Sequence, residues 1–487
     1  MIARRRLFTH FGAAALVAGA APRRLQAQTL HDVVVIGAGL SGLYAAYLLE
    51  EAGLKVQVLE GRRRVGGRVY TLMDVPGNPE AGGELIGGNY ARMIDTARAL
   101  GLNLIPPNPL GPPGKWMYRL RDQNILAEDW PDHPLNPLSG EDRKLLPNQL
   151  LATLSNRNNP LDGRALDDWL LPEFQRFDIP HSEYLRTVLG LNEETIRLMN
   201  VVIHTDHIDN TSALHEMRRY AVGAFNRRMG GGGNFGREHD PPPALQVEGG
   251  NSRLPEAMAA SLENGVLLGK TVYAIEDAGD AVTVHCGDGT TYRARQVICS
   301  TPFPVLRKIM FAPRLPPILA GAVAEIDYGI SIQVHFLIKR KYWEQDGLPA
   351  GMWTDSPVER FTVLARGAQG EPTSAIAFVN GNEAFKYDLM TDAEVFAYTL
   401  QEIAKVRPAA AGALEPILVQ SCHREAHGAG DWIFWRPGQV TRYANHMRDR
   451  HGNVVFAGEH TAVMERGMEG AFEGGERAAF DVMEKLG

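Results

Sequence analysis

The first regular pattern along this chain is a short apolar run, a glycine-rich turn and a stretch of helical periodicity. Residues 32–36 read Asp-Val-Val-Val-Ile, a β-branched run that is typical of a buried parallel strand. Apolar residues then recur at helical spacing over residues 43–52, Gly53 interrupts them, and a second strand-like run covers residues 55–59. The pattern predicts a strand, a helix and a second strand, which is the repeating unit of a parallel α/β sheet.

Periodicity also assigns elements to the remainder of the chain. A loop is expected where glycines fill residues 230–233 and prolines fill residues 241–243. A final helix is expected from Gly467 to Leu486. The other expected elements are strands at residues 281–285, 296–300, 330–338 and 361–364, and helices at residues 193–204 and 211–222.

Length and composition describe an ordinary globular chain. The 487 residues correspond to roughly three domain-sized units, and 44% hydrophobic with 22% charged residues excludes disorder as the dominant state. A run of about 20 apolar residues, which a membrane span requires, does not occur in the sequence. The three cysteines lack the spacing of a disulfide framework or a zinc site and are expected to be small buried side chains.

The first 27 residues have the character of an export signal. They combine a basic start, an apolar run at residues 11–21 and a short segment that ends at Ala27. The string Arg5-Arg6-Leu7-Phe8 resembles the twin-arginine signal, which exports proteins that have already folded with their cofactors. We therefore expect a periplasmic protein, with an N-terminal helix of a cytoplasmic protein as the alternative. Without residues 1–27 the chain has 45 basic and 57 acidic residues, a charge of −12 that disfavours nucleic acid as a partner.

The glycine-rich turn between the first strand and helix has the chemistry of a dinucleotide site. Gly37 permits the tight turn, Gly39 lets the backbone approach a pyrophosphate, and Gly42 lets the helix pack closely on the strand. Ser41, within the same turn, is assigned to the site as well, because the helix N-terminus offers free N–H groups to phosphates. Glu60 follows the second strand, where its carboxylate can accept hydrogen bonds from ribose hydroxyls.

The residues after Glu60 narrow the cofactor. The stretch of residues 60–68, with Arg62, Gly67 and Arg68, resembles the Glu-x-Arg-x-Arg-x-Gly-Gly-Arg segment of the FAD-dependent amine oxidase family, which includes monoamine, polyamine and L-amino-acid oxidases. The resemblance extends over about residues 31–487 and implies FAD rather than NAD. Further family blocks occur at residues 81–87, 248–255, 271–272, 454–461 and 467–471. These blocks imply that eight further residues contact the cofactor: Gly83, Glu84, Leu85, Val272, Gly458, Glu459, Gly467 and Met468.

The positions of these blocks predict an α/β protein with a discontinuous FAD-binding, Rossmann-like domain and a mixed α+β substrate domain. The FAD domain is expected to comprise residues 31–108, 244–316 and 420–487. The substrate domain is expected to comprise residues 109–243 and 317–419. In the family, the second part of the substrate domain forms a sheet over the flavin.

The sequence departs from the family at the position of a lysine that lies over the flavin. The family pattern places this lysine ten residues before a tryptophan, and here Gln333 stands ten residues before Trp343. Gln333 can hold a water molecule but brings no positive charge to a developing superoxide. We therefore expect slow reaction with oxygen, or another electron acceptor. The alternative is that Gln333 only fills space.

The two aromatic walls that flank the amine in monoamine oxidases are also altered. The position before the Met-Glu-Gly segment is Gly467, so one wall is missing. Trp432 is the candidate for the other wall, and Trp435 is the second choice. A cysteine that binds FAD covalently in some relatives corresponds to Gly430, or a residue close to it, which predicts non-covalent FAD.

Two smaller features are assigned structural roles. Arg92 is interpreted as part of an ion pair rather than as a ligand of a substrate carboxylate. The His204–His207 segment has spacing too loose for a metal site, so no metal is expected.

The resemblance implies that the enzyme oxidises the C–N bond of an amine or L-amino acid by hydride transfer to flavin N5. The imine product is then hydrolysed, and the flavin is reoxidised by oxygen, giving hydrogen peroxide, or by a carrier. Gln333 and Trp432 are the catalytic candidates. A homodimer is compatible with the resemblance, and no stable membrane anchor is expected. Oxidation of C–C bonds and a non-catalytic role are the alternatives.

Overall fold

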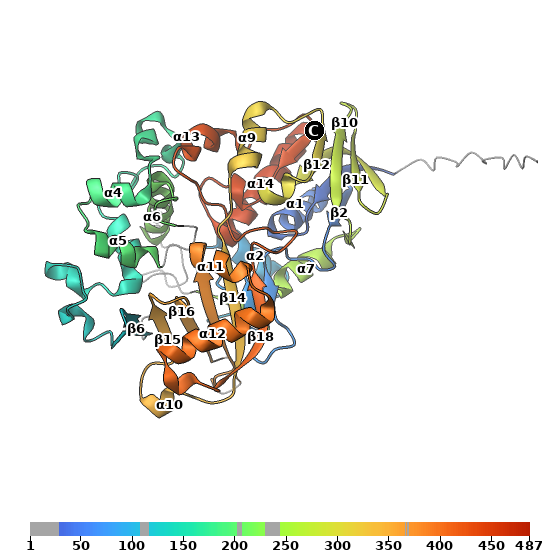
Figure 1. The fold of residues 1–487 in the computed structure, drawn as a ribbon. Helices are drawn as coiled ribbons and strands as arrows, with labels where there is room; N and C mark the ends of the chain where they lie inside the picture. The colour runs from blue at the N-terminus through green and yellow to red at the C-terminus, as the bar shows by residue number, and fades with distance from the viewer. Residues whose placement is uncertain (1–28, 108–115, 202–206, 229–243, 366, 368–369) are drawn as a thin grey trace, which may run out of the picture.

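A computed structural model describes residues 29–107, 116–201, 207–228, 244–365, 367 and 370–487. Two large mixed sheets, two two-stranded sheets (β3-β4 and β5-β8) and a group of helices make up the described part of the molecule. In Figure 1 the helices α4, α5 and α6 lie on the left, the strands β10, β11 and β12 lie on the right, and β14, β16 and β18 lie below and between them. The expected α/β fold is confirmed.

The first sheet has eight strands, in the order β13-β10-β11-β12-β1-β2-β9, with β19 pairing with β12. β1 lies between β2 and β12 and is parallel to both, and β12 is also parallel to β19. The carboxyl ends of these four strands therefore meet at one edge, which is where open α/β sheets bind their ligands. The strands are β1 (Leu30–Ile36), β2 (Val56–Glu60), β9 (Val266–Leu268), β10 (Val272–Asp277), β11 (Val282–Cys286), β12 (Thr291–Cys299), β13 (Met310–Ala312) and β19 (Val454–Phe456).

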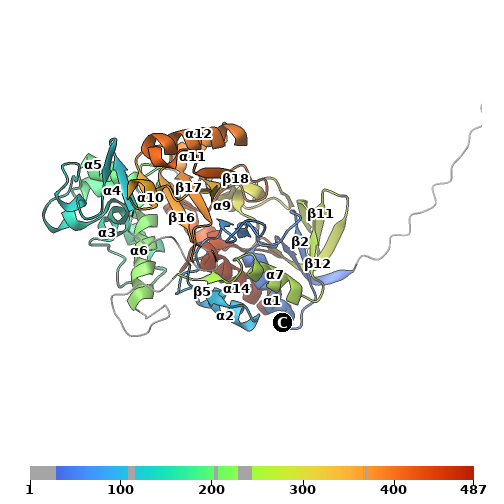
Figure 2. The same cartoon turned by 90° about the horizontal axis from the view of Figure 1, so that it is seen from below.

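Helices cover the first sheet and join the two ends of the chain. α1 (Leu40–Glu51) packs along α14 (Gly467–Leu486), and the rings of Tyr44 and Phe472 lie 4.6 Å apart between them. α2 (Ala91–Ala99) and α7 (Arg253–Ser261) lie beside this pair (Figure 2). The first and last segments of the chain thus form one layer.

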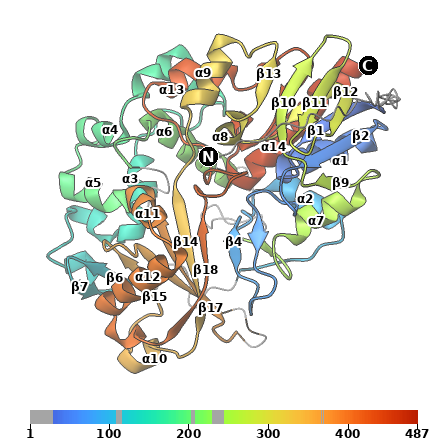
Figure 3. The same ribbon diagram turned by 45° about the vertical axis from the view of Figure 1, so that its right-hand side comes forward.

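The second sheet has seven strands, in the order β18-β14-β17-β16-β15-β6-β7. In Figure 3 its strands β14 and β18 lie between the helical part on the left and the first sheet on the right. The strands are β6 (Trp116–Leu120), β7 (Gln123–Ile125), β14 (Ser331–Ile338), β15 (Gly351–Thr354), β16 (Arg360–Leu364), β17 (Ser374–Asn380) and β18 (Leu414–Ser421).

Strand alternation gives this second sheet two different faces. Val334, Phe336 and Phe361 belong to an apolar core that also includes Ala384 of α11 (Gly381–Asp388) and Ile403 of α12 (Asp392–Val406). Figure 2 shows both helices along one side of the sheet. The residues between these positions on the same strands face the other way, towards the first sheet.

Shorter elements complete the fold. The helical part contains α3 (Leu150–Ser155), α4 (His181–Thr187), α5 (Glu193–Asn200) and α6 (Ala213–Arg228). The remaining short helices and strands are β3 (Tyr70–Thr71), β4 (Glu80–Gly82), β5 (Leu104–Ile105), β8 (Gln246–Val247), α8 (Phe303–Leu306), α9 (Pro317–Glu325), α10 (Trp343–Asp346) and α13 (Gln439–Tyr443). The 3-10 helices are Trp130–Asp132, Gly140–Lys144, Pro147–Gln149, Asp168–Leu170, Pro172–Phe177, Pro408–Ala410, Ala444–His446 and Glu459–Thr461.

Apart from Leu30 at the start of β1, all strands of the first sheet come from the segments expected for the FAD domain. In the second sheet, β18 crosses the expected boundary at residue 420. The boundaries themselves stay a prediction. The expected export signal, the glycines of residues 230–233 and the prolines of residues 241–243 lie outside the described residues. In the described part of the chain, no helix combines the length and the apolar character that crossing a membrane requires.

Candidate active site

A cavity of about 540 Å³ lies at the carboxyl edge of the first sheet and is closed on the other side by the second sheet. It brings together nearly all residues that the sequence assigns to a site; only Gly42 is not part of its wall. The predicted residues that line it are Gly37, Gly39, Ser41, Glu60, Arg62, Gly67, Arg68, Gly83, Glu84, Leu85, Val272, Gln333, Trp432, Gly458, Glu459, Gly467 and Met468.

The turn between β1 and α1 can be built only with glycine at two positions. Gly37 has a φ of +103°, a conformation that L side chains rarely adopt. A Cβ atom on Gly42 would lie 2.0 Å from the carbonyl oxygen of Gly37, so this position requires the absence of a side chain. Gly42 therefore acts through packing, behind the cavity wall. The hydroxyl of Ser41 is buried and has no hydrogen-bond partner among the described residues.

Glu60 is held at the end of β2 by backbone donors. The N–H of Ala38 donates to one carboxylate oxygen at 2.8 Å, and the N–H of Arg62 donates to the other at 2.7 Å. The side chain is 4% exposed. These bonds fix the carboxylate beside the N-terminus of α1 and leave further lone pairs of both oxygens for a ligand.

Two ion pairs tie the arginine-rich stretch to the last part of the chain. The guanidinium of Arg62 pairs with Glu425. Arg68 Nη1 lies 3.2 Å from Glu459 Oε1 and also donates to the backbone carbonyl of Asp431. The same Glu459 oxygen accepts the N–H of Ile433 at 2.7 Å. Arg68 and Glu459 therefore hold one wall of the cavity in place.

The glycine-rich segment of residues 81–87 contacts two other motifs. A Cβ on Gly83, whose φ is +69°, would lie 3.0 Å from Met468 Sδ at the start of α14. The amide of Asn251 donates to the carbonyls of Gly83 at 2.7 Å and Glu84 at 3.1 Å. Leu85 lines the cavity and is 44% exposed. Three sequence blocks more than 150 residues apart thus meet at one place.

A row of side chains crosses the second sheet on its cavity face. Gln333 of β14 pairs in register with Gln420 of β18 and with Phe378 of β17, and Phe378 pairs with Arg360 of β16. All four line the cavity. Gln333 Oε1 lies 2.9 Å from Nε2 of the fully buried His335, which fixes the amide. The sequence predicted Gln333 but gave no indication of Arg360 or His335.

Asp431 is a further cavity residue that the motifs did not indicate. Its carboxylate accepts the hydroxyl proton of Ser331 at 2.9 Å. Burial raises the pKa of Asp431 to about 6, more than the Ser331 bond and the positive charge of Arg68 lower it. An acid next to the predicted Trp432 was visible in the sequence, but its burial was not.

Trp432 and Gly467, which the resemblance assigns to the positions of the two aromatic walls, both line the cavity. Trp432 lines the cavity, and the guanidinium carbon of Arg466 lies 5.8 Å from its ring centre. A Cβ on Gly467 would meet only the Tyr90 hydroxyl, at 3.9 Å, so this side of the cavity is open. Trp435, the second choice, is 2% exposed and packs on Trp169 away from the lining.

Arg92, which the sequence assigns to an ion pair, and the lysines Lys308, Lys339 and Lys341 have structural roles. Arg92 forms ion pairs with Glu469 at 3.3 Å and Glu476 at 2.7 Å, as expected. Lys339 and Lys341 pair with Glu415 and Glu344 outside the cavity. Lys308 donates to the carbonyl of Ala426.

The sequence predicts that all three cysteine side chains are buried, and the structure confirms this for two of them. Cys286 and Cys299 are buried, but the expectation is wrong for Cys422, which is half-buried and lines the cavity. It follows the end of β18, where its sulfur lies 3.3 Å from the Ser331 hydroxyl oxygen, whose proton is donated to Asp431. Burial, with Asp431 second, raises the pKa of this thiol to about 12 and keeps it neutral.

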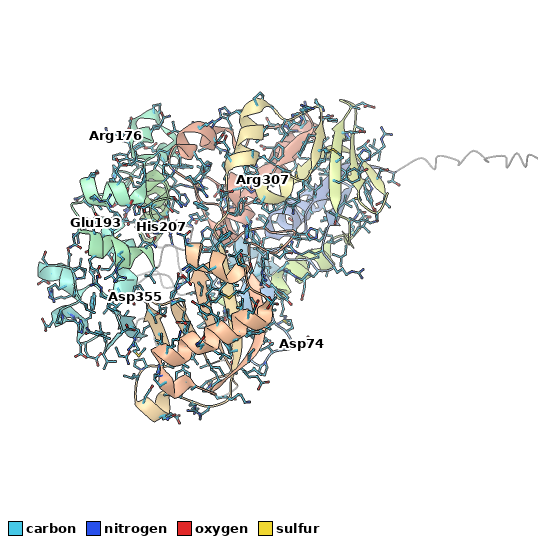
Figure 4. The ribbon with its side chains drawn as sticks, in the orientation of Figure 1. Asp74, Arg176, Glu193, His207, Arg307 and Asp355 are labelled. Atoms are coloured by element: carbon cyan, nitrogen blue, oxygen red, sulfur yellow. The ribbon has the colours of Figure 1, made fainter. Side chains whose placement is uncertain are left out.

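The His204–His207 segment is described only at His207. Residues 204–206 lie outside the described residues, and His207 lies in the helical part with Glu193 (Figure 4). Among the described residues, no group of three or more His, Cys, Asp or Glu side chains could hold a metal ion.

Comparison with known proteins identifies the family. The family model of flavin-containing amine oxidoreductases matches residues 40–483. This chain belongs to that family. It is 28% identical to amine oxidase [flavin-containing] B of Sus scrofa over 465 residues, which cover 94% of this chain and 86% of the relative. It is 26% identical to the Oncorhynchus mykiss amine oxidase [flavin-containing] over 474 residues, which cover 95% and 88%.

Solved structures agree in fold. Putrescine oxidase bound to putrescine matches with a TM-score of 0.77 at 23% identity, over 94% of this chain and 99% of the other. Cyclohexylamine oxidase from Brevibacterium oxydans IH-35A matches with a TM-score of 0.76 at 24% identity, over 94% and 100%. Because the chain belongs to the flavin-containing amine oxidoreductase family, it is an enzyme with FAD as its cofactor.

The residues that line the cavity fit FAD independently of the family comparison. The buried Ser41 hydroxyl, which has no partner among the described residues, lies at the N-terminus of α1, and helix N-termini favour phosphate groups. Glu60 is held by two backbone bonds at the end of β2, and glycines at residues 37, 39, 66 and 67 keep the wall free of side chains. The expected contacts of individual residues with FAD stay predictions.

Proposed function

We propose that this protein oxidises the C–N bond of a small amine to an imine, with FAD bound non-covalently across the cavity. The bound flavin supplies the redox chemistry, since it takes up two electrons and a proton equivalent from the carbon next to the nitrogen. The proposal rests on one observation: the dinucleotide turn at Gly37 and the side chain of Gln333 on the second sheet line the same cavity.

The residues of this chain orient the amine and remove the proton from its ammonium form. Asp431, with a pKa raised to about 6, is ionised at neutral pH and can attract an ammonium group or accept its proton. Trp432 offers an aromatic wall, and the open position at Gly467 admits a bulky or branched group. The fixed amide of Gln333 can hold a water molecule at the cavity wall. The electron acceptor is oxygen or a redox carrier.

We also propose that the protein is exported to the periplasm after folding. The proposal rests on the Arg5-Arg6-Leu7-Phe8 string and the apolar run of residues 11–21. An oxidase with FAD held only by contacts must acquire it where FAD is made, and the twin-arginine pathway permits this.

The function is tested by mixing the purified holoenzyme with amines and L-amino acids in the absence of oxygen and recording the visible absorbance of the flavin. Bleaching by one compound supports amine oxidation and identifies its class. Readmitting air then shows whether oxygen restores the absorbance. If no amine or amino acid bleaches the flavin, amine oxidation is wrong, and oxidation of C–C bonds or a non-catalytic role takes its place.

A further inference from the structure

A short loop, residues 422–430, leads from the end of β18 back to the cavity. The N–H of Gly430 donates to the carbonyl of Cys422 at 2.8 Å, so the two ends of the loop lie side by side. Within the loop, the N–H of Ala429 donates to the carbonyl of Glu425 at 2.8 Å. A surface loop whose ends meet in this way is a compact unit, and we call it the Ω-loop.

The Ω-loop is fastened to residues that belong to the first sheet and its connections. The carboxylate of Glu425 forms an ion pair with Arg62, which follows β2, and the Nε–H of Arg62 donates to the other carboxylate oxygen at 3.3 Å. Lys308 donates to the carbonyl of Ala426 at 3.3 Å. The loop starts at a strand of the second sheet, so these contacts make it a bridge between the two sheets.

His427 is the side chain that the Ω-loop places on the residue after β2. A Cβ on Gly61 would lie 2.7 Å from two atoms of the His427 imidazole, Cε1 and Nδ1. The ring therefore packs directly on the Gly61 backbone, and a larger residue than glycine would displace it. The same Cβ would lie 3.4 Å from the hydroxyl oxygen of Thr271. His427, Gly61 and Thr271 thus meet at one corner, and all three line the cavity.

This corner belongs to the adenosine end of the dinucleotide site. In a dinucleotide fold, the acid that follows the second strand binds the ribose of the adenosine. Here that acid is Glu60, the last residue of β2 and the neighbour of Gly61. The N–H of Lys270, next to Thr271, donates to the carbonyl of Glu60 at 2.7 Å and holds this wall together. The imidazole of His427 therefore lies beside the ribose-binding acid.

We propose that the Ω-loop holds the adenosine half of FAD, with the His427 imidazole in contact with the adenosine and the Arg62–Glu425 ion pair keeping the loop closed. An imidazole has a flat aromatic face on which a nucleoside can pack. The inference concerns only how FAD is bound, so it does not depend on which compound the enzyme oxidises.

The Ω-loop meets a requirement of FAD that is held only by contacts. The sequence predicts that no cysteine near residue 430 binds FAD covalently. A Cβ on Gly430 would lie 2.2 Å from the Cβ of Tyr328, so this position has no room for a side chain. Without a covalent bond, FAD stays bound only as long as its contacts last, and its adenosine half leaves when the Ω-loop opens. The loop therefore sets the rate of FAD release.

The experiment measures how fast the holoenzyme loses FAD. Holoenzyme is diluted, and the increase in fluorescence of the released flavin gives the rate constant. We expect His427→Ala to release FAD roughly five- to tenfold faster, as the loss of one ring contact with a nucleoside warrants. The visible absorbance spectrum of the flavin that is still bound should equal that of the wild type, because the substitution affects the adenosine half.

Further variants separate the ring contact from the closure of the loop. His427→Phe keeps a ring against Gly61 and should retain slow release. Glu425→Gln removes the ion pair and should speed release. The matched control is His423→Ala, since His423 lies in the same loop but is 3.4 Å from Asp388, outside the cavity lining, and this variant should release FAD at the wild-type rate.

Chemical modification adds a measurement on the wild-type chain. Diethyl pyrocarbonate modifies accessible imidazoles, and mass spectrometry compares each histidine with FAD bound and after FAD has been released. Bound FAD should protect His427 and leave the reactivity of His423 unchanged.

Three results would overturn the inference. One is release of FAD from His427→Ala at the wild-type rate, and another is equally fast release from His423→Ala. The third is equal reactivity of His427 with and without FAD. A changed flavin spectrum in His427→Ala would also contradict it, because the ring would then act on the flavin half. Amine oxidation is untouched by each of these results, since none of them measures turnover.

Discussion

At the scale of single residues, Gln333 has the most direct consequence for the reaction with oxygen. Its amide is buried and held by His335, and the family resemblance predicts a lysine at this position. A lysine would bring a positive charge to the site where superoxide develops. We expect Gln333→Lys to raise the rate constant for reoxidation of the reduced enzyme by oxygen by about tenfold or more, measured by stopped-flow absorbance.

The control for this change is Gln333→Met, which has similar length and no charge. It should leave the reaction with oxygen as slow as in the wild type. If the lysine and methionine variants react with oxygen at the same rate as the wild type, Gln333 only fills space.

Asp431 should introduce a pH-dependent step into substrate reduction. Its pKa is raised to about 6, mainly by burial, so the carboxylate forms as the pH increases through that value. A carboxylate attracts the ammonium form of the substrate, whereas the neutral acid does not. We expect the efficiency of flavin reduction to rise with pH through about 6 and Asp431→Asn to lose this step. A step that persists in the variant would assign the ionisation to another group.

The raised pKa of Asp431 also makes the stability of the folded protein depend on pH. The folded-state pKa of Asp431 lies above its ordinary value of 3.8, so the folded protein binds the proton more tightly than the unfolded chain. This contribution favours folding at low pH and is lost as the pH rises from about 4 to about 6. Asp431→Asn should therefore gain stability relative to the wild type over that interval, which thermal unfolding at several pH values can show.

At the scale of elements, the junction of β1 and α1 depends on one glycine that does not line the cavity. A Cβ on Gly42 would lie 2.0 Å from the Gly37 oxygen, which forces the helix away from the strand. We expect Gly42→Ala to destabilise the protein by about 3 kcal/mol or more and to release FAD, measured by chemical unfolding and flavin fluorescence. The control is Gly287→Ala, whose Cβ would come no closer than 3.7 Å to the Thr271 oxygen. Equal stability of both variants would contradict the packing argument.

The elements also show what the sequence could and could not predict. The strand, the glycine turn and the acid at Glu60 each depend on residues close together in the sequence. Their order along the chain was therefore enough to predict the dinucleotide site. Helix ends were less certain: α1 begins at Leu40 rather than residue 43, because the glycine turn already directs the chain into the helix. Arg360 and Asp431 could not be assigned, since their common cavity depends on the register of distant strands.

At the scale of the whole molecule, the cofactor joins segments from both ends of the chain. Arg68 contacts Glu459, and Gly83 lies against Met468, so FAD would bind only when these segments are assembled. We expect removal of FAD to lower stability by about 4 kcal/mol when free FAD exceeds its dissociation constant a thousandfold. Thermal unfolding with and without added FAD measures this. Precipitation with acid should release all flavin into solution; flavin that stays with the protein would show a covalent bond.

The dependence of assembly on FAD leads to a prediction about export. A protein whose first and last segments assemble around a non-covalently bound cofactor would have to fold with that cofactor before export. Replacing Arg5 and Arg6 with lysine should therefore keep the protein in the cytoplasm as a flavin-loaded enzyme, while the same change at Arg23 and Arg24 should leave the twin-arginine pair and export intact. Cell fractionation with flavin absorbance in each fraction measures both variants. Export of the Arg5 and Arg6 variant, or arrival of flavin-free protein in the periplasm, would show that another route carries the chain.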